Sequence, residues 1–310
     1  VHLHCHSVFS FFAGTCTVEE LVLRAKSLGM KALALTDTDR MSGLIRFYLE
    51  CKKQGIKPIL GVELTEPANP HENIVLLAKN SNGYSDICEI ISQRHIHEET
   101  FSFKDIFAKL WPDLFFLTSF PSLFTLLSQS PNRKNLYGEL INNSKLTRER
   151  SWRIKKLAQQ NNIPLVVSND SYFLNHKDWA THKILKAIGL LSTISRLKPF
   201  EYADREASLK NEKDMQLLFP SFTQAVNNTK HIANTCNVQL SLNNWILPKI
   251  SVPDGYTPQS YLKELASLGL KDKYGNSSNY DKAKKIQKME LKVISKLGYS
   301  SYFLMVRQIR

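Results

Sequence analysis

The sequence opens with Val-His-Leu-His-Cys-His-Ser at residues 1–7, and this stretch predicts the first strand of the fold. Side chains alternate between the two faces of a strand, so the histidines at positions 2, 4 and 6 are expected on one face, and the leucine and cysteine on the other. Two imidazoles at one strand end can bind the same metal ion. The stretch therefore predicts a metal site, and the alternative is a histidine-rich surface strand.

Short apolar runs alternate with amphipathic helices through the first 190 residues. This alternation indicates a parallel sheet covered by helices, and seven such units predict a barrel. The alternative, an open doubly wound sheet, would carry a Gly-x-Gly-x-x-Gly loop after its first strand, and the sequence has none. The expected strands are 1–7, 31–36, 58–63, 73–78, 114–118, 136–140 and 164–168. The expected helices are 18–28, 41–54, 84–93, 121–128, 147–161 and 178–188.

The pattern changes after about residue 195, where the expected strands end. We place a domain boundary near residues 195–210. The apolar run 302–306 stands almost at the end of the sequence, so we expect that the chain continues in a longer protein. The helices expected after the boundary are 211–218, 222–236, 258–268 and 281–297.

The composition is strongly basic, with a net charge of +13 at pH 7. Residues 1–195 carry 23 Lys and Arg against 18 Asp and Glu, a net of +5, and residues 196–310 carry 18 against 10, a net of +8. This excess predicts a polyanionic partner, most often nucleic acid, and the alternative is a merely soluble basic surface. No run of 18 apolar residues is present, so no membrane span is expected. Five cysteines without a Cys-x-x-Cys pair indicate a reducing cytoplasm.

Several motifs resemble those of PHP domains, the fold named after polymerases and histidinol phosphatase. The motifs are His4-Cys5-His6-Ser7, Leu35-Thr36-Asp37, the strand 57–63 and the segment 164–170. They are most similar to the PHP domains of bacterial C-family DNA polymerases, the group of polymerase III alpha subunits. The resemblance implies a PHP-type distorted (β/α)7 barrel of the α/β class at residues 1–195. A linker and the start of the polymerase core, both mainly helical, would follow at residues 196–310.

The resemblance also implies a metal site. The family ligands that this sequence retains are His4, His6, Glu63 and Asp170. Positions where the family has a ligand and this sequence does not are Ala13, Thr38, Asn73 and Tyr172. The retained set implies at most one divalent ion, zinc, manganese or magnesium, and a barrel with a structural role. Two alternatives stay open: a free-standing PHP metal-dependent phosphoesterase or 3′–5′ exonuclease, and a non-catalytic DNA-binding scaffold.

Lysines recur every four residues on the last expected helix, and this spacing forms one ridge. The ridge consists of Lys284, Lys288, Lys292 and Lys296. In a polymerase-like protein it predicts contact with DNA phosphates, and the alternative is a solvated helix face.

The resemblance finally implies the activity of a full-length protein, template-directed DNA synthesis in replication or in error-prone repair. Such a protein would use Mg²⁺, primer–template DNA and deoxynucleotides, would work with other polymerase holoenzyme subunits, and would lie in the bacterial cytoplasm. The palm aspartates of the family are expected beyond residue 310, so no catalytic residue is assigned here.

Overall fold

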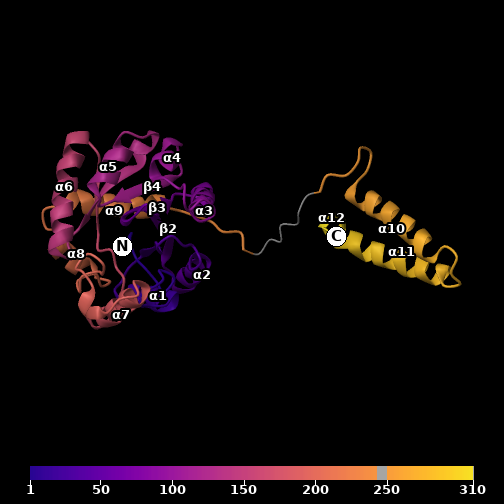
Figure 1. Ribbon diagram of the computed structural model, residues 1–310, viewed down its shortest axis with the longest axis horizontal. Helices are drawn as coiled ribbons and strands as arrows, with labels where there is room; N and C mark the ends of the chain where they lie inside the picture. The colour runs from indigo at the N-terminus through magenta and orange to yellow at the C-terminus, as the bar shows by residue number, and fades with distance from the viewer. Residues whose placement is uncertain (243–249, 310) are drawn as a thin grey trace. The chain divides into compact units, whose positions relative to one another are not determined.

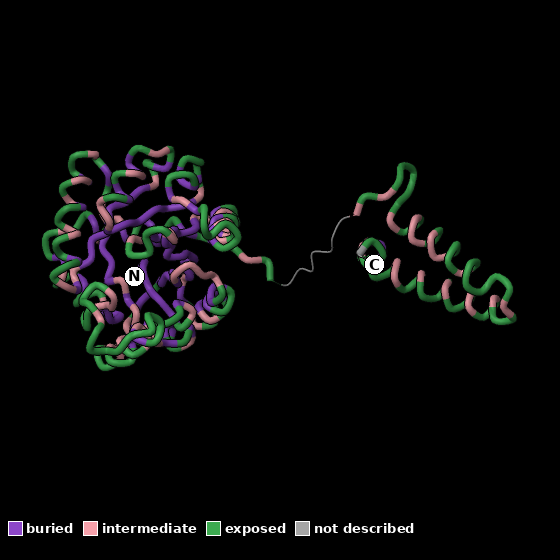
Figure 2. The backbone as a smooth tube through the Cα atoms, viewed as in Figure 1, coloured by how far each residue is buried: buried purple, intermediate pink, exposed green. Residues whose placement is uncertain are grey.

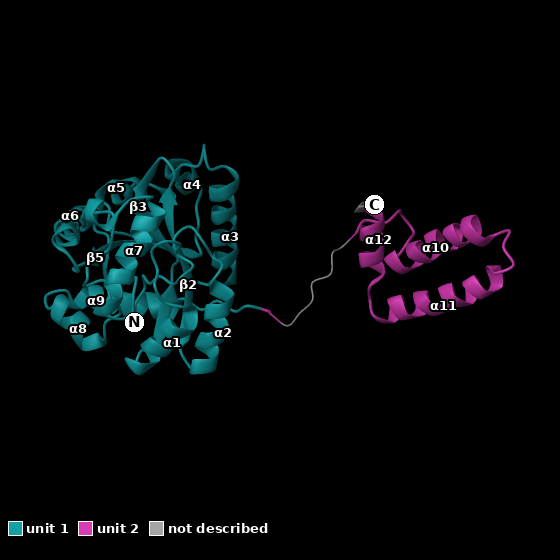
Figure 3. Cartoon of the chain, turned by 60° about the horizontal axis from the view of Figure 1, so that its bottom comes forward, with its two compact units in different colours: residues 1–240 teal, residues 241–310 magenta. Residues whose placement is uncertain are grey.

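The computed structural model describes residues 1–242 and 250–309 (Figure 1). The chain divides into two compact units, unit 1 with residues Val1–Leu240 and unit 2 with residues Ser241–Arg310 (Figure 3). Unit 1 contains strands and helices, and the described part of unit 2 is helical. This confirms the α/β class and the mainly helical second part.

Unit 1 is built on a six-stranded sheet in the order β1-β2-β3-β4-β5-β6. The pairs β1–β2, β4–β5 and β5–β6 are parallel, whereas β3 is antiparallel to both neighbours. The wholly parallel sheet that we predicted is wrong at β3, because two residues join it to β2 and a hairpin needs no crossover helix. The strands are β1 (Ala32–Leu35), β2 (Lys57–Glu66), β3 (Asn69–Ala78), β4 (Leu114–Thr118), β5 (Leu136–Ile141) and β6 (Leu165–Ser168).

The predicted first strand, residues 1–7, is not a regular strand, although it lies where a strand would close the sheet. On one side the Ala34 N–H of β1 donates to the His2 carbonyl at 2.9 Å. On the other side the His6 N–H donates to the carbonyl of Ser171, beyond β6, at 2.9 Å. The segment thus connects β1 with the chain that follows β6, and it completes the barrel-like arrangement without strand geometry.

The helices between residues 18 and 161 cover one face of this sheet and pack buried apolar residues against it. Figure 2 shows buried positions along the strands and exposed positions on the outer turns of the helices. The first of them begins at a capping box, in which Thr17 and Glu20 each bond the other's backbone N–H. The expected helices are all present, and the short α4 was not predicted because six residues give too little helical periodicity. The helices of unit 1 are α1 (Val18–Ser27), α2 (Leu44–Gln54), α3 (Ser81–Ile96), α4 (Phe103–Ala108), α5 (Pro121–Ser128), α6 (Lys145–Asn161), α7 (Trp179–Gly189), α8 (Glu212–Leu218) and α9 (Thr223–Thr235).

The opposite face of the sheet is filled by α9. Its residues Ile232 and Ala233 are buried in one cluster with strand residues such as Val75 and Leu117. The Thr229 hydroxyl also bonds the backbone of β6 at 3.2 Å. The first compact unit extends to Leu240 and so includes α9, which completes the core inside the barrel.

The described residues of unit 2 contain three helices, α10 (Pro258–Tyr274), α11 (Tyr280–Lys296) and α12 (Ser300–Ile309). The helix α10 is longer than predicted, and α12 was not predicted. None of the helices in the described residues is long and apolar enough to cross a membrane.

Candidate metal centre

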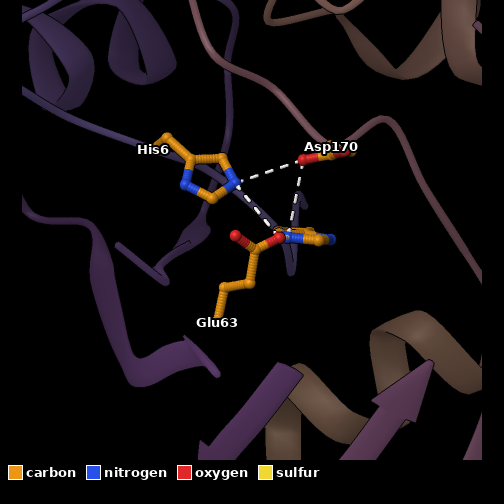
Figure 4. Close-up of side chains that lie close together, drawn as sticks. His6, Glu63 and Asp170 are labelled. Carbon is orange, nitrogen blue, oxygen red and sulfur yellow. Dashed lines mark hydrogen bonds and ion pairs between the residues drawn. The ribbon is translucent and has the colours of Figure 1, made fainter. Parts of the chain in front are cut away.

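Four residues from three distant parts of unit 1 form one buried cluster. The ligand atoms of His4, His6, Glu63 and Asp170 all lie within 4.8 Å of one another. Figure 4 shows the labelled side chains His6, Glu63 and Asp170 pointing toward a common centre. The two histidines come from the N-terminal segment, Glu63 lies near the end of β2, and Asp170 follows β6. The structure thus brings together the four residues that were predicted from the sequence as candidate metal ligands.

The spacings within this cluster suit a single ion. His4 Nε2 lies 3.1 Å from Glu63 Oε2 and 3.5 Å from Asp170 Oδ1. His6 Nε2 lies 3.9 Å from Glu63 Oε2 and 3.1 Å from Asp170 Oδ1. Ligands about 2.1 Å from a tetrahedral metal lie about 3.4 Å from each other. Two imidazoles and two carboxylates at these separations therefore fit one divalent ion.

Each histidine of the cluster is oriented by a hydrogen bond at its other nitrogen. His4 Nδ1 lies 2.9 Å from Glu139 Oε1, and His6 Nδ1 lies 2.9 Å from the Ser10 hydroxyl. The Ser10 hydroxyl donates to Asp37 at 2.7 Å, so Ser10 accepts from His6. Both Nε2 atoms are then left to face the cluster, which is the arrangement that metal-ligating histidines usually have.

The role of Glu139 was not predicted from the sequence. It is fully buried on β5, where it also accepts a hydrogen bond from the Ser168 hydroxyl. Its position in strand 136–140 could have indicated that it is buried. Side chains alternate along a strand, so Glu139 lies on the same face of the sheet as Tyr137. An acidic residue at such a position requires a partner, and His4 is that partner.

Three of the four positions that lack a family ligand, Thr38, Asn73 and Tyr172, still contact the cluster, but through other interactions. The Thr38 hydroxyl donates to Glu63 Oε1 at 2.7 Å, and the Asn73 amide donates to Glu63 Oε2 at 2.6 Å. The Tyr172 ring stacks on His6 with the ring centres 4.0 Å apart. Both carboxylate oxygens of Glu63 are therefore already hydrogen-bonded by neutral side chains.

The charges of the cluster stabilise one another. Burial would lower the pKa of His4, but the carboxylates of Asp170, Glu139 and Glu63 outweigh it and raise that pKa well above its ordinary value. Burial would raise the pKa of Asp170, but His4 and His6 outweigh it and lower the pKa to about 2. The pKa of Glu63 is lowered against burial by the same two histidines. The cluster can thus hold a positive charge, either a protonated His4 or a metal ion.

The third histidine of residues 1–7, His2, lies outside this cluster. His2 turns away from it and bonds the Lys210 carbonyl through Nε2 at 2.8 Å, so the three histidines of residues 1–7 do not share one face. The reason is the irregular backbone, which also places Leu3 and Cys5 in different hydrophobic clusters.

The predicted lysine ridge lies on α11 in unit 2. Its four residues, Lys284, Lys288, Lys292 and Lys296, are exposed.

His182, on α7, is a buried histidine with two backbone partners. Its Nδ1–H donates to the Ala13 carbonyl at 2.7 Å, and its Nε2 accepts from the Ala203 N–H at 2.9 Å. Burial lowers the pKa of His182 to about 4. Protonation would direct a second N–H against that of Ala203, so the fold requires the neutral ring.

Lowering the pH from 7.5 to 5.0 is therefore expected to remove about 2 kcal/mol of stability through His182. The sign follows because the unfolded imidazole takes up a proton below about pH 6.5, whereas the folded one does so only near pH 4. Urea unfolding at the two pH values measures the loss. His182→Gln, which can donate and accept at the same places, should reduce it by that amount, and an unchanged pH dependence in this variant would contradict the assignment.

The fold and the cluster define an α/β barrel whose strand ends carry a mixed histidine and carboxylate cluster that could hold a metal ion. A family profile described as "PHP domain" matches residues 2–163, which is more than half of the chain. The chain therefore belongs to the PHP domain family. A second profile, described as "Bacterial DNA polymerase III alpha NTPase domain", matches residues 260–309.

Curated relatives extend the similarity over almost the whole chain. The DNA polymerase III subunit alpha of Halalkalibacterium halodurans is 29% identical over 99% of this chain and 29% of its own length. The error-prone DNA polymerase of Symbiobacterium thermophilum is 28% identical over 99% of this chain and 31% of its own length. The chain thus spans less than a third of these relatives. A solved two-domain protein from Bacteroides vulgatus, described as containing a PHP-like metal-dependent phosphoesterase, is 17% identical over 55% of this chain and 51% of its own, with a TM-score of 0.38.

Proposed function

We propose that this chain is the N-terminal part of a DNA polymerase III alpha-type protein, in which the PHP barrel has a structural role. Residues 1–195 would form the PHP domain, and residues 196–310 would lead into the polymerase core. The full-length protein would extend primer–template DNA with deoxynucleotides and Mg²⁺, together with other holoenzyme subunits in a bacterial cytoplasm. The similarity to two kinds of alpha-type polymerase over 99% of the chain supports this assignment.

One observation supports a structural role for the barrel, namely the hydrogen bonding of the Glu63 carboxylate. Hydrolysis of phosphate esters at a multi-metal site needs carboxylates that bridge two ions and stabilise both the attacking and the leaving oxygen. Here Thr38 and Asn73 donate to the two oxygens of Glu63. His4, His6, Glu63 and Asp170 would then hold at most one divalent ion, zinc, manganese or magnesium.

The expected result is at most one divalent ion per chain and no hydrolysis. Elemental analysis after equilibration with Mn²⁺ counts the ions. Assays on a 3′-labelled oligonucleotide and on a simple phosphate ester test for hydrolysis, and a primer-extension assay with Mg²⁺ tests these 310 residues for synthesis, which is also expected to be absent.

Two outcomes would overturn the structural role. One is a count of two or more ions per chain. The other is 3′ trimming that disappears in His4→Ala but persists in His2→Ala, a matched change at a buried histidine outside the cluster. Either outcome would favour a PHP phosphoesterase or 3′–5′ exonuclease. Primer extension by the 310 residues would instead mean that the polymerase centre has been misplaced.

The lysine ridge of α11 is proposed as a contact for DNA phosphates. Each phosphate neutralised on duplex DNA contributes about −0.9 to the slope of log affinity against log salt, because counterions are released. Replacing Lys284, Lys288, Lys292 and Lys296 by Gln is expected to reduce the magnitude of that slope by about 2–4. Fluorescence anisotropy with a labelled duplex over a range of salt concentrations measures it. An unchanged slope would indicate that the ridge is an ordinary solvated helix face that does not contact DNA.

A further inference from the structure

Among the helices that the structure describes, α6 in unit 1 combines many positive charges with an exposed tryptophan on its outer surface. The helix carries six Lys and Arg and one acidic residue, Glu149. Trp152 has 67% of its surface exposed, although indole is a large apolar group that usually packs. The indole therefore remains available to a ligand.

The exposed residues of α6 follow one ridge of the helix. Arg148, Trp152 and Lys156 are spaced four residues apart, so they lie about one turn, or about 6 Å, from one another along the axis. The ridge thus presents a flat aromatic face with a cation on each side. Among the residues that the structure describes, neither Arg148 nor Lys156 takes part in an ion pair.

A cavity of about 180 Å³ opens beside this ridge. Arg148 and Trp152 form part of its wall, and Leu140 of β5 and Phe219 at the end of α8 add apolar surface. Lys155, one turn from Ser151 in the same wall, places its ammonium 5.1 Å from the ring centre of Phe222. The site therefore offers an apolar recess, an aromatic platform and several cations in one place.

We propose that the Arg148–Trp152–Lys156 ridge and its cavity bind single-stranded nucleic acid. An unpaired base would stack on the Trp152 indole, and the phosphates on either side of that base would contact Arg148 and Lys156. Aromatic platforms flanked by basic side chains bind single strands in this way, and every base has a face that can stack. In a duplex the base faces are already stacked on their neighbours, so the ridge selects the single strand.

This site consists of other residues than the α11 ridge, which belongs to the other unit, so the effect of each site on binding can be measured without the other. All measurements use the full chain with the four α11 lysines replaced by Gln. A labelled mixed-sequence single strand and a duplex of the same length serve as probes, and anisotropy gives the affinity at several salt concentrations. Failure of the α11 proposal then leaves this test intact.

Trp152→Ala is expected to weaken binding of the single strand about 5- to 100-fold, which corresponds to the loss of one stacked base. The slope against log salt and the affinity for duplex should both stay unchanged, because no charge is removed. The double variant Arg148→Gln/Lys156→Gln should instead reduce the magnitude of the single-strand slope by about 1.4, or about 0.7 for each phosphate that is no longer neutralised. Lys52→Gln/Lys53→Gln on α2, which removes the same charge from another helix, should leave both quantities unchanged.

The proposal is overturned if Trp152→Ala keeps the affinity for the single strand within twofold. It is also overturned if the α2 control lowers the slope as much as the α6 variant, since the effect would then be one of net charge. Binding of a glutamate-rich, leucine-containing peptide that depends on Trp152, without binding of the single strand, would assign the ridge to an acidic protein segment instead. Trp152 is mostly exposed, so its replacement should leave folding intact, and the urea midpoint checks this.

Discussion

Replacing His4 with alanine is expected to lower the free energy of unfolding by about 3–5 kcal/mol in metal-free buffer. His4 lies 2.9 Å from Glu139 and 3.1 Å from Glu63, and all three side chains are almost completely buried. Removing the imidazole leaves two buried carboxylates without their cationic partner, which costs more than the hydrogen bonds alone. Urea unfolding in the presence of a chelator measures the loss.

The pH dependence of this loss has a definite sign. The pKa of His4 is raised in the folded state, so its stabilising effect is fully present below the unfolded pKa, near 6.5, and disappears as the pH rises through the folded value. The penalty of His4→Ala should therefore be larger at pH 6 than at pH 9.

His2→Ala is the matched control, because His2 is equally buried but bonds only a backbone carbonyl. Its cost is expected to be about 1–2 kcal/mol. A cost for His4→Ala no greater than that for His2→Ala would show that the cluster does not depend on a positive charge.

The candidate site could be predicted from the sequence because its residues lie at recognisable places in the chain. Glu63 ends an apolar run, Asp170 follows another, and His4 and His6 stand at the start. Strand ends meet at one edge of a barrel, so residues more than 160 apart could be expected together. The direction of β3 could not be predicted in this way, because a local apolar pattern does not distinguish a parallel from an antiparallel strand.

Contacts between distant side chains were beyond the reach of the sequence. The bond between His4 and Glu139 joins residues 135 positions apart, and nothing local to either residue indicates the other. The role of α9 was missed for a related reason. Its apolar face is visible as a helical pattern, but the pattern does not say that the surface it packs against is the opposite face of the sheet.

The double variant Thr38→His/Asn73→His is expected to raise the metal content from at most one ion to two per chain. Both wild-type side chains donate to Glu63, at 2.7 and 2.6 Å, so both already reach the cluster. An imidazole at each place would supply a metal ligand in exchange for a hydrogen bond, and Glu63 would then be free to bridge two ions. Elemental analysis and calorimetric titration with Mn²⁺ count the ions in both proteins.

The control for this exchange is Thr38→Val/Asn73→Leu, which removes the same two hydrogen bonds from Glu63 but adds no ligand. It should bind no more ions than the wild type, and it should be less stable because a buried carboxylate loses two donors. A second ion in this control would mean that the hydrogen bonds alone exclude it. No second ion in the histidine variant would mean that the barrel has lost the geometry of a multi-metal site as well as its ligands. The expected result is a second ion only in the histidine variant. It would mean that the wild type binds no second ion because positions 38 and 73 supply no metal ligand.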